Sequence, residues 1–236
     1  MIFGNLFKSN KADSAPGYAG LTDSHSHILP GVDDGIRSME DSLAVLAEYE
    51  KLGFKKVWLT PHIMEDVPNT TDALKKRFAE LKAEYKGCLT LDLASENMLD
   101  NLFLERLEKL DFLPIYDNHL LVETSYFSPP MNLTDVLKQI MSAGFIPLLA
   151  HPERYVYMDM DMYRELHDMG VKLQLNVLSL SGFYGKSAKE KSHKLAKHGM
   201  YSVFGSDLHR LSQTEHLRHV SAELKKYIKQ GNLEGI

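Results

Sequence analysis

The stretch DSHSH, residues 23–27, follows the first predicted β-strand and decides between two folds. Short apolar or β-branched runs alternate with amphipathic stretches of helical period along almost the whole chain, which is typical of βα units around a parallel sheet. An open doubly wound sheet usually carries a glycine-rich phosphate-binding turn after its first strand, and DSHSH occupies that place here. The sequence therefore favours a closed or distorted barrel.

Seven βα units can be counted outward from this stretch, and no long polar linker separates them. We expect strands over residues 21–27, 56–60, 89–94, 120–123, 146–150, 172–177 and 201–204. We expect helices over residues 39–52, 72–86, 103–110, 133–143, 160–169, 188–198 and 214–230, most of them followed by a glycine. The pattern predicts one α/β domain, a distorted TIM-like (βα)7 barrel over residues 20–236, preceded by a flexible N-terminal arm over residues 1–19.

Composition excludes several classes of partner. The 236 residues include 27 Lys and Arg against 32 Asp and Glu, a net charge of -5, so no broad basic field is available for nucleic acid. No apolar run approaches the roughly 20 residues that span a bilayer, and the N-terminus lacks a signal-peptide cleavage site, so we expect no membrane insertion. The single cysteine, Cys88, allows no internal disulfide, which fits a reducing, cytoplasmic location.

Residues of metal-binding types follow six of the seven predicted strands. In a barrel of this kind the loops after the strands form the active site, so residues far apart in sequence would meet at one edge. Only the sixth strand, which ends at Asn176, offers no ligand candidate. The candidates in chain order are His25, His27, Asp33 and Asp34, then His62, Glu96, Glu123 and His151, then Asp207 and His209.

The mixture of imidazoles and carboxylates points to divalent metals. The two histidines of the H-x-H pair, His25 and His27, point to the same side of a strand. Nitrogen and oxygen ligands without thiolate suit Mn, Fe or Zn, and the number of candidates is too large for one ion. A single histidine can instead be structural, and a single acidic residue can cap the next helix. Six coincident strand ends favour a site of two or three ions.

These motifs resemble the polymerase and histidinol phosphatase (PHP) superfamily, and within it the metal-dependent tyrosine phosphatases of bacterial capsule and exopolysaccharide clusters (CpsB/CapC-like). The resemblance runs from about Leu21 to the last helix and rests on DSHSHILPGVDDG (23–35), LTPH (59–62), Glu96, Glu123, AHPERY (150–155) and GSDLH (205–209). It implies a distorted seven-stranded barrel with a trinuclear centre, usually assigned as manganese, with iron or zinc as alternatives. The implied activity is hydrolysis of protein phosphotyrosine, on the tyrosine-rich tail of a partner bacterial tyrosine kinase.

The resemblance also assigns the ligands to three ions. It places His25, His27 and Asp207 on one ion, with Glu96 bridging to a second ion that Glu123 and His151 also hold. It places Asp34, His62 and His209 on the third. Two departures stand out: Ile63 follows His62 where many relatives have histidine or arginine, and ASEN (94–97) surrounds Glu96 in place of the commoner glycine-alanine-glutamate.

Other residues near the expected site receive catalytic or binding roles. We expect Arg154 to make a bidentate contact to phosphate, the alternative being a salt bridge at the rim. His209, or a metal-bound water, is a candidate general acid. Six loop aromatics could line a pocket for the phosphotyrosine ring or could pack into the fold: Tyr126, Phe127, Tyr155, Tyr157, Phe183 and Tyr184.

Competing functions make different demands on the sequence. The cysteine–arginine spacing of thiol-dependent tyrosine phosphatases is absent, and we expect Cys88 to be a buried structural thiol. An amidohydrolase would need a lysine after strand four and a histidine after strand six, where Glu123 and Asn176 occur. A PHP phosphatase acting on a small phosphomonoester such as histidinol phosphate, and a non-catalytic metal-bound phosphotyrosine-binding regulator, stay open as alternatives.

Overall fold

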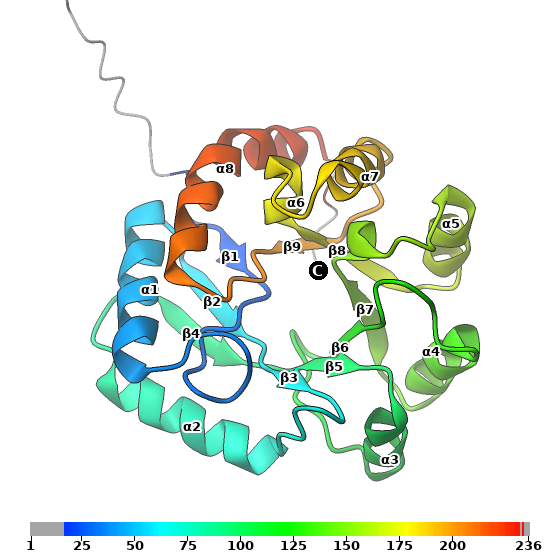
Figure 1. Cartoon of the computed structure of the whole chain (residues 1–236), viewed down its shortest axis with the longest axis horizontal. Coiled ribbons are helices and arrows are strands. Elements are labelled where there is room, and N and C mark those ends of the chain that lie inside the picture. The colour runs from blue at the N-terminus through cyan, green and yellow to red at the C-terminus, as the bar shows by residue number, and fades with distance from the viewer. Residues whose placement is uncertain (1–16, 232, 234–236) are drawn as a thin grey trace, which may run out of the picture.

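A curled parallel sheet forms the centre of the molecule and helices surround it (Figure 1). The computed structural model describes residues 17–231 and residue 233. One three-stranded part has the order β1 (Thr22–Asp23), β2 (Lys56–Leu59) and β4 (Thr90–Leu93). The other part has six strands in the order β3 (His62–Ile63), β5 (Glu96–Met98), β6 (His119–Glu123), β7 (Ile146–Ala150), β8 (Lys172–Asn176) and β9 (Val203–Gly205). The protein is thus a mixed α/β single-domain fold, as the alternating pattern predicts.

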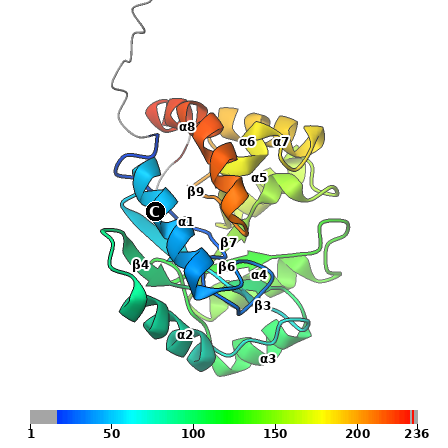
Figure 2. The same cartoon turned by 60° about the vertical axis from the view of Figure 1, so that its left-hand side comes forward.

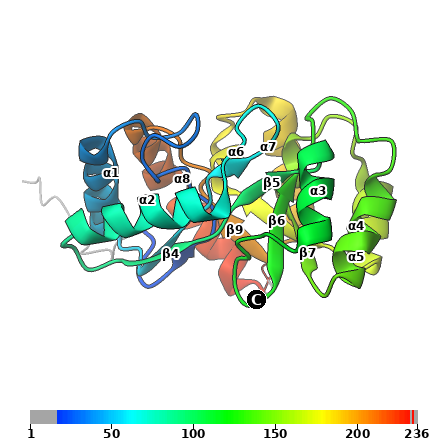
Figure 3. The ribbon, with the colours of Figure 1, turned by 90° about the horizontal axis from the view of Figure 1, so that it is seen from below.

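The helices run back along the outside of the sheet. They are α1 (Met39–Leu52), α2 (Thr71–Glu84), α3 (Asn101–Lys109), α4 (Leu133–Ser142), α5 (Met160–Asp168), α6 (Val177–Ser181), α7 (Lys186–Lys197) and α8 (Thr214–Lys229), with 3-10 turns at Pro152–Arg154 and Leu211–Gln213. The last helix, α8, packs beside the first, α1 (Figure 2). In a side view, the loops after β1 and after β6 rise on the same side of the sheet (Figure 3). No helix among the described residues is both long and apolar enough to cross a bilayer.

Helix ends follow the local signals in the sequence. The side chain of Ser38 accepts a hydrogen bond from the backbone N–H of Asp41 and so caps the start of α1. Gly53, with φ of 91°, ends the same helix in the left-handed conformation that favours glycine. The predicted range of this helix and its end at a glycine are therefore confirmed.

The first strand is shorter than predicted because its second half bonds to two parts of the sheet at once. Only Thr22 and Asp23 pair with β2. Beyond them, Thr60 N donates to Ser26 O at 2.8 Å, while Asp207 N donates to His25 O at 2.8 Å and His27 N to Leu208 O at 3.0 Å. Residues 24–27 therefore join the three-stranded part of the sheet to the loop after β9. We call this segment the seam.

Two sequence predictions outside the sheet require correction. The predicted arm, residues 1–19, lies mostly outside the described residues, but residues 17–19 form a turn in which Tyr18 is fully buried. The Tyr18 hydroxyl donates to Leu217 O at 2.8 Å and its ring stacks on Phe54, which fixes this turn to the core. Cys88 is exposed, so the prediction of a buried thiol is wrong. The backbone N–H of Cys88 donates to the Glu50 side chain at 2.7 Å, in the bend that precedes β4.

Candidate metal centre

The structure brings all nine predicted ligands together at the edge of the sheet where the strands end. Each of them has a nitrogen or oxygen atom within 3.4 Å of one from another member of the set. The members are His25, His27, Asp34, His62, Glu96, Glu123, His151, Asp207 and His209. Their side chains come from segments spread over most of the chain, and the parallel sheet is what makes them neighbours.

Four of these residues surround a single point. His25 Nε2 lies 3.1 Å from His27 Nε2, 3.2 Å from a Glu96 oxygen and 3.4 Å from an Asp207 oxygen. His27 Nε2 lies 3.3 Å and 3.2 Å from the same two oxygens, Glu96 Oε2 and Asp207 Oδ1. Donor atoms that bind one first-row metal at about 2.0–2.1 Å in a tetrahedron are separated by about 3.3 Å. The spacing of the four residues therefore fits one ion.

Three of the histidines, His25, His27 and His209, use Nδ1 for a hydrogen bond outside the cluster, so their Nε2 atoms face it. The amide oxygen of Gln174 accepts from His25 Nδ1 at 2.7 Å, and the carboxylate of Asp33 accepts from His27 Nδ1 at 2.8 Å. The backbone oxygen of Asp207 accepts from His209 Nδ1 at 2.8 Å. Because these oxygens can only accept, each Nδ1 carries a proton, so Nε2 is the nitrogen that faces the cluster and that would give its lone pair to a metal ion.

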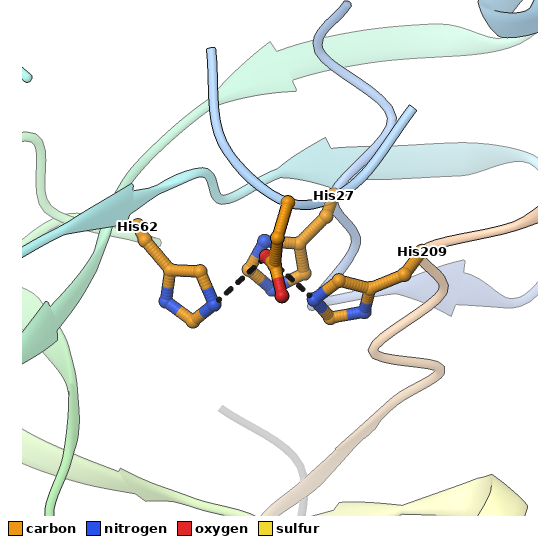
Figure 4. A group of neighbouring side chains, drawn as sticks. His27, His62 and His209 are labelled. Atoms are coloured by element: carbon orange, nitrogen blue, oxygen red, sulfur yellow. Dashed lines mark ion pairs between the residues drawn. The ribbon is translucent and has the colours of Figure 1, made fainter. Parts of the chain in front are cut away.

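His62 lies between two further groups. Its Nδ1 is 3.2 Å from Glu96 Oε2 and 3.1 Å from Glu123 Oε1, while its Nε2 is 3.6 Å from Asp34 Oδ1. On the far side of that Asp34 oxygen lies His209 Nε2, at 3.3 Å. Figure 4 shows the rings of His27, His62 and His209 turned toward one another around this position. A second group thus consists of His62, Glu96 and Glu123, and a third of His27, Asp34, His62 and His209.

The remaining ligand candidate, His151, approaches the second group from the other side. Its Nε2 lies 2.9 Å from Glu96 Oε1 and 3.7 Å from Glu123 Oε2. Both His151 and Asp207 have left-handed backbones, with φ of 36° and 52°. Such conformations are costly for residues other than glycine and tend to occur at functional sites.

Unpaired buried atoms indicate that the cluster is built for cations. His62 Nδ1 lies 3.2 Å from Glu96 Oε2 and 3.1 Å from Glu123 Oε1, and all three atoms are buried. None of the three has a hydrogen-bond partner among the described residues. Leaving buried polar atoms unpaired is costly, and a divalent cation between them would satisfy all three. Burial alone would raise the pKa of Glu96, but the imidazoles of His25 and His62 hold that pKa well below its usual value. The residues present therefore fit divalent metal ions.

Asp207 is oriented by three donors that the sequence did not reveal as a group. One of its oxygens, Oδ2, accepts from Arg154 Nη1 at 2.7 Å, from Asn176 Nδ2 at 3.0 Å and from the Tyr184 hydroxyl at 3.3 Å. The other oxygen, Oδ1, is thereby left to face His25 and His27. Asn176 is thus a positioning residue, and the only signal for it in the sequence is its place at the end of the sixth predicted strand.

Arg154 is held between two aromatic rings. Its guanidinium carbon lies 4.3 Å from the ring centre of Tyr126 and 4.0 Å from that of Tyr184. The Arg154 guanidinium therefore occupies the space between these two rings, and the ring of a phosphotyrosine cannot also bind there. Of the other loop aromatics, Tyr155 is buried in the core and Tyr157 bonds Thr124, whereas Phe127 and Phe183 are exposed.

One buried carboxylate, that of Asp23, supports the site from beneath. Asp23 accepts from the backbone N–H groups of His25 and Ser206, at 3.1 and 2.8 Å, and from the Tyr49 hydroxyl. Burial raises the pKa of Asp23 in spite of these hydrogen bonds. Asp23 therefore ties the backbone that carries His25 to the backbone that carries Asp207.

A family model for capsular polysaccharide synthesis proteins, CpsB/CapC, matches residues 21–236 of this chain. The chain belongs to the CpsB/CapC family. The chain is 30% identical over 203 residues to tyrosine-protein phosphatase CpsB of Streptococcus pneumoniae, with 81% of this chain and 84% of that protein covered. It is 26% identical over 196 residues to tyrosine-protein phosphatase YwqE of Bacillus subtilis, with 80% and 77% covered.

Solved structures of such relatives share the fold of this CpsB/CapC chain. The crystal structures of YwqE from Bacillus subtilis and CpsB from Streptococcus pneumoniae are described as those of unique metal-dependent tyrosine phosphatases. A chain from that work matches this one with a TM-score of 0.75 at 24% identity, covering 86% of this chain and 87% of the solved one. The resemblance predicted from the sequence motifs is thereby confirmed.

A close contact in this CpsB/CapC chain leads to a first prediction. A Cβ atom added at Gly205 would lie 2.3 Å from His25 Cβ and 3.1 Å from His25 N. The substitution Gly205→Ala should therefore displace His25, destabilise the fold by about 1–3 kcal/mol and weaken metal binding. Manganese retained after dialysis and the midpoint of thermal unfolding would measure both effects.

The control for this prediction is Gly144→Ala. Gly144 has φ of 91° and no atom within 4 Å of an added Cβ, so alanine there strains the backbone without approaching the cluster. We expect this variant to lose about 1 kcal/mol of stability and to keep its metal. Equal metal retention in the two variants would show that Gly205 does not position His25.

Proposed function

We propose that this chain is a metal-dependent protein tyrosine phosphatase that hydrolyses phosphotyrosine in protein substrates. The observation that carries the proposal is the cluster of imidazoles and carboxylates whose ring nitrogens and unpaired carboxylate oxygens converge. The relatives named as tyrosine-protein phosphatases support the choice of substrate class.

In this proposal the centre holds two or three divalent ions, manganese first among the candidates and iron or zinc after it. His25, His27, Glu96 and Asp207 hold one ion, and Asp34, His62 and His209 hold another. Glu96, Glu123 and His151 would hold the remaining ion. His62 Nε2 lies beside Asp34 and its Nδ1 beside Glu123, and because a neutral imidazole has one lone pair, His62 would serve one of these two ions.

Bound divalent cations supply a water nucleophile at neutral pH and neutralise the charge that develops on the phosphoryl oxygens. Arg154 has five N–H donors, of which one bonds Asp207, so the same side chain can orient a ligand and contact a phosphate oxygen. His209 donates its Nδ1 proton to the Asp207 carbonyl and turns Nε2 to Asp34. We therefore propose His209 as a ligand and not as the general acid. A phenolate, with a pKa near 10, leaves without strong assistance.

The finer parts of the proposal concern the partner, the location and the barrel. The substrate would be the tyrosine-rich tail of a bacterial tyrosine kinase that controls capsule or exopolysaccharide synthesis, in the cytoplasm. We also propose that the seam closes the sheet as a distorted TIM-like (βα)7 barrel, since its backbone bonds both to the end of β2 and to the loop after β9.

The test compares two substrates on the same metal-loaded protein. A phosphotyrosine peptide and histidinol phosphate would be assayed side by side after metal removal and stepwise return of Mn, Fe or Zn. We expect kcat/KM for the peptide to exceed that for histidinol phosphate by at least about a hundredfold, because a site selects the substrate whose contacts it can complete. Preference for histidinol phosphate would favour the small-molecule alternative. Tight peptide binding without turnover would favour the non-catalytic regulator.

A further inference from the structure

Exposed apolar side chains gather on the loops that follow the strands. Among the described residues six large apolar side chains are exposed, and five of these lie in loops on the side of the metal centre: Phe127, Met131, Val156, Phe183 and Leu211. The sixth, Leu110, follows α3, which runs back from that side. Single exposed apolar residues are ordinary, but a group of them beside a reactive site marks a recognition surface.

One of these side chains, Val156, lines a cavity near the metal centre, and two others, Phe127 and Phe183, are next in sequence to residues that line it. The cavity has a volume of 210 Å³ and is lined by Tyr126, Arg154, Val156, Tyr184, Ala188 and Lys191, among others. Val156 lines it directly, Phe127 follows Tyr126, and Phe183 precedes Tyr184. Val156 N also donates to Tyr126 O at 2.9 Å, which holds the two loops together. We call Phe127, Val156 and Phe183 the apolar rim.

Arg154 lies between this cavity and the metal centre. Arg154 lines it and donates to Asp207, whose other oxygen faces His25 and His27. A phosphoryl group held at the centre would therefore place the residues next to the phosphotyrosine over this cavity and its rim.

The charges in the cavity favour an apolar neighbour over an acidic one. Of the two cations that line it, Arg154 is paired with Asp207, and Lys191 Nζ donates to the backbone oxygens of Tyr155 and Met158 at 2.5 and 2.8 Å. The Asp207 carboxylate already neutralises the charge of Arg154, and two carbonyl oxygens already solvate Lys191, so the cavity attracts an acidic side chain only weakly. An apolar side chain would cover exposed apolar surface.

We propose that the apolar rim selects phosphotyrosines flanked by aliphatic or aromatic residues in an extended segment of the protein substrate. This inference rests on the proposed function and adds to it the sequence context that the enzyme reads. The occupant of the surface is thus the substrate chain itself.

The test measures kcat/KM for metal-loaded protein on matched phosphotyrosine peptides whose flanking residues are Leu, Ser or Glu, with free phosphotyrosine as reference. We expect the Leu-flanked peptide to be preferred over the Glu-flanked one by about tenfold, the range for one apolar group in a pocket. In the double variant Phe127→Ser with Phe183→Ser this preference should disappear. Both side chains are exposed, at 79% and 43%, so the variant should unfold at the wild-type temperature.

The matched control is Leu110→Asn. This residue is 57% exposed and has φ of 53°, a conformation that asparagine tolerates, and it lies away from the rim. The control should keep the wild-type preference.

The possible outcomes separate this inference from the proposed function. Turnover of free phosphotyrosine without preference among the peptides, or with preference for Glu, would overturn the inference alone. Absence of turnover on every phosphotyrosine substrate would overturn the proposed function. Loss of self-association in the double variant, measured by sedimentation, without any peptide preference would assign the rim to a second copy of the chain and also overturn the inference.

Discussion

Removal of divalent cations by a chelator should abolish phosphotyrosine hydrolysis, with a fall in kcat of at least about a thousandfold. The cations supply several kcal/mol of charge stabilisation in such sites, and each 1.36 kcal/mol corresponds to about tenfold in rate. Among the described residues, the cluster itself consists of carboxylates and imidazoles that would donate lone pairs to a cation, and the charge of the neighbouring Arg154 is already neutralised by Asp207.

The same treatment should lower the midpoint of thermal unfolding. A cation present at about a thousand times its Kd stabilises the folded state by about 4 kcal/mol. For a chain of this length, that loss corresponds to a decrease of about 10 °C. Differential scanning calorimetry and a phosphotyrosine assay on one sample would measure both effects, and return of one metal at a time would identify the ion that restores them. Full turnover by protein shown to be metal-free by elemental analysis would refute the metal mechanism.

The substitution Glu96→Gln should decrease kcat by at least about a thousandfold and should remove at least one ion. Glu96 Oε2 approaches His25, His27 and His62 at 3.2–3.3 Å, and its Oε1 approaches His151 at 2.9 Å. Glutamine keeps one oxygen, replaces the other with a donor and removes the charge. The loss therefore affects every group of ligands that shares this carboxylate.

Stability should respond in the opposite sense to activity. Glu96 is fully buried, so the neutral side chain relieves the cost of burying a charge when no cation is present. The variant should unfold no earlier than the metal-free wild type. Glu80→Gln is the matched control, because Glu80 is exposed and, among residues 17–231, forms an ion pair with Arg77 alone. The kcat of this variant should stay within about twofold of wild type. An E96Q protein that keeps its metal content and its activity would contradict the role given to Glu96.

The sequence predicted that the candidate ligands lie close together, because the residues that follow parallel strands come to the same edge of the sheet. It did not predict the hydrogen-bond partners of those ligands. Gln174 and Asn176 lie in β8, a strand in which polar and apolar residues alternate, and only the register between β8 and β9 places them beside His25 and Asp207. Side chains that orient other side chains leave no pattern in a single sequence.

Short elements were missed for a related reason. Strands β3 and β5 have two and three residues, and α6 has five, which is too few for a period to be recognised. The first strand was predicted too long because residues 24–27 have the composition of a strand, although their backbone groups bond in two directions. Cys88 was predicted as buried on residue type alone, and its place in a turn overrides that preference.

The seam joins residues that are about as distant in the chain as any in the fold. The Ser206 hydroxyl donates to His25 O across 181 positions, and closing a loop of that length carries a large entropic cost. An ion held by His25 and His27 on one side and Asp207 on the other would fasten the two ends of the sheet. A chain with a single cysteine cannot make an internal disulfide, and in this protein coordination would serve as the cross-link.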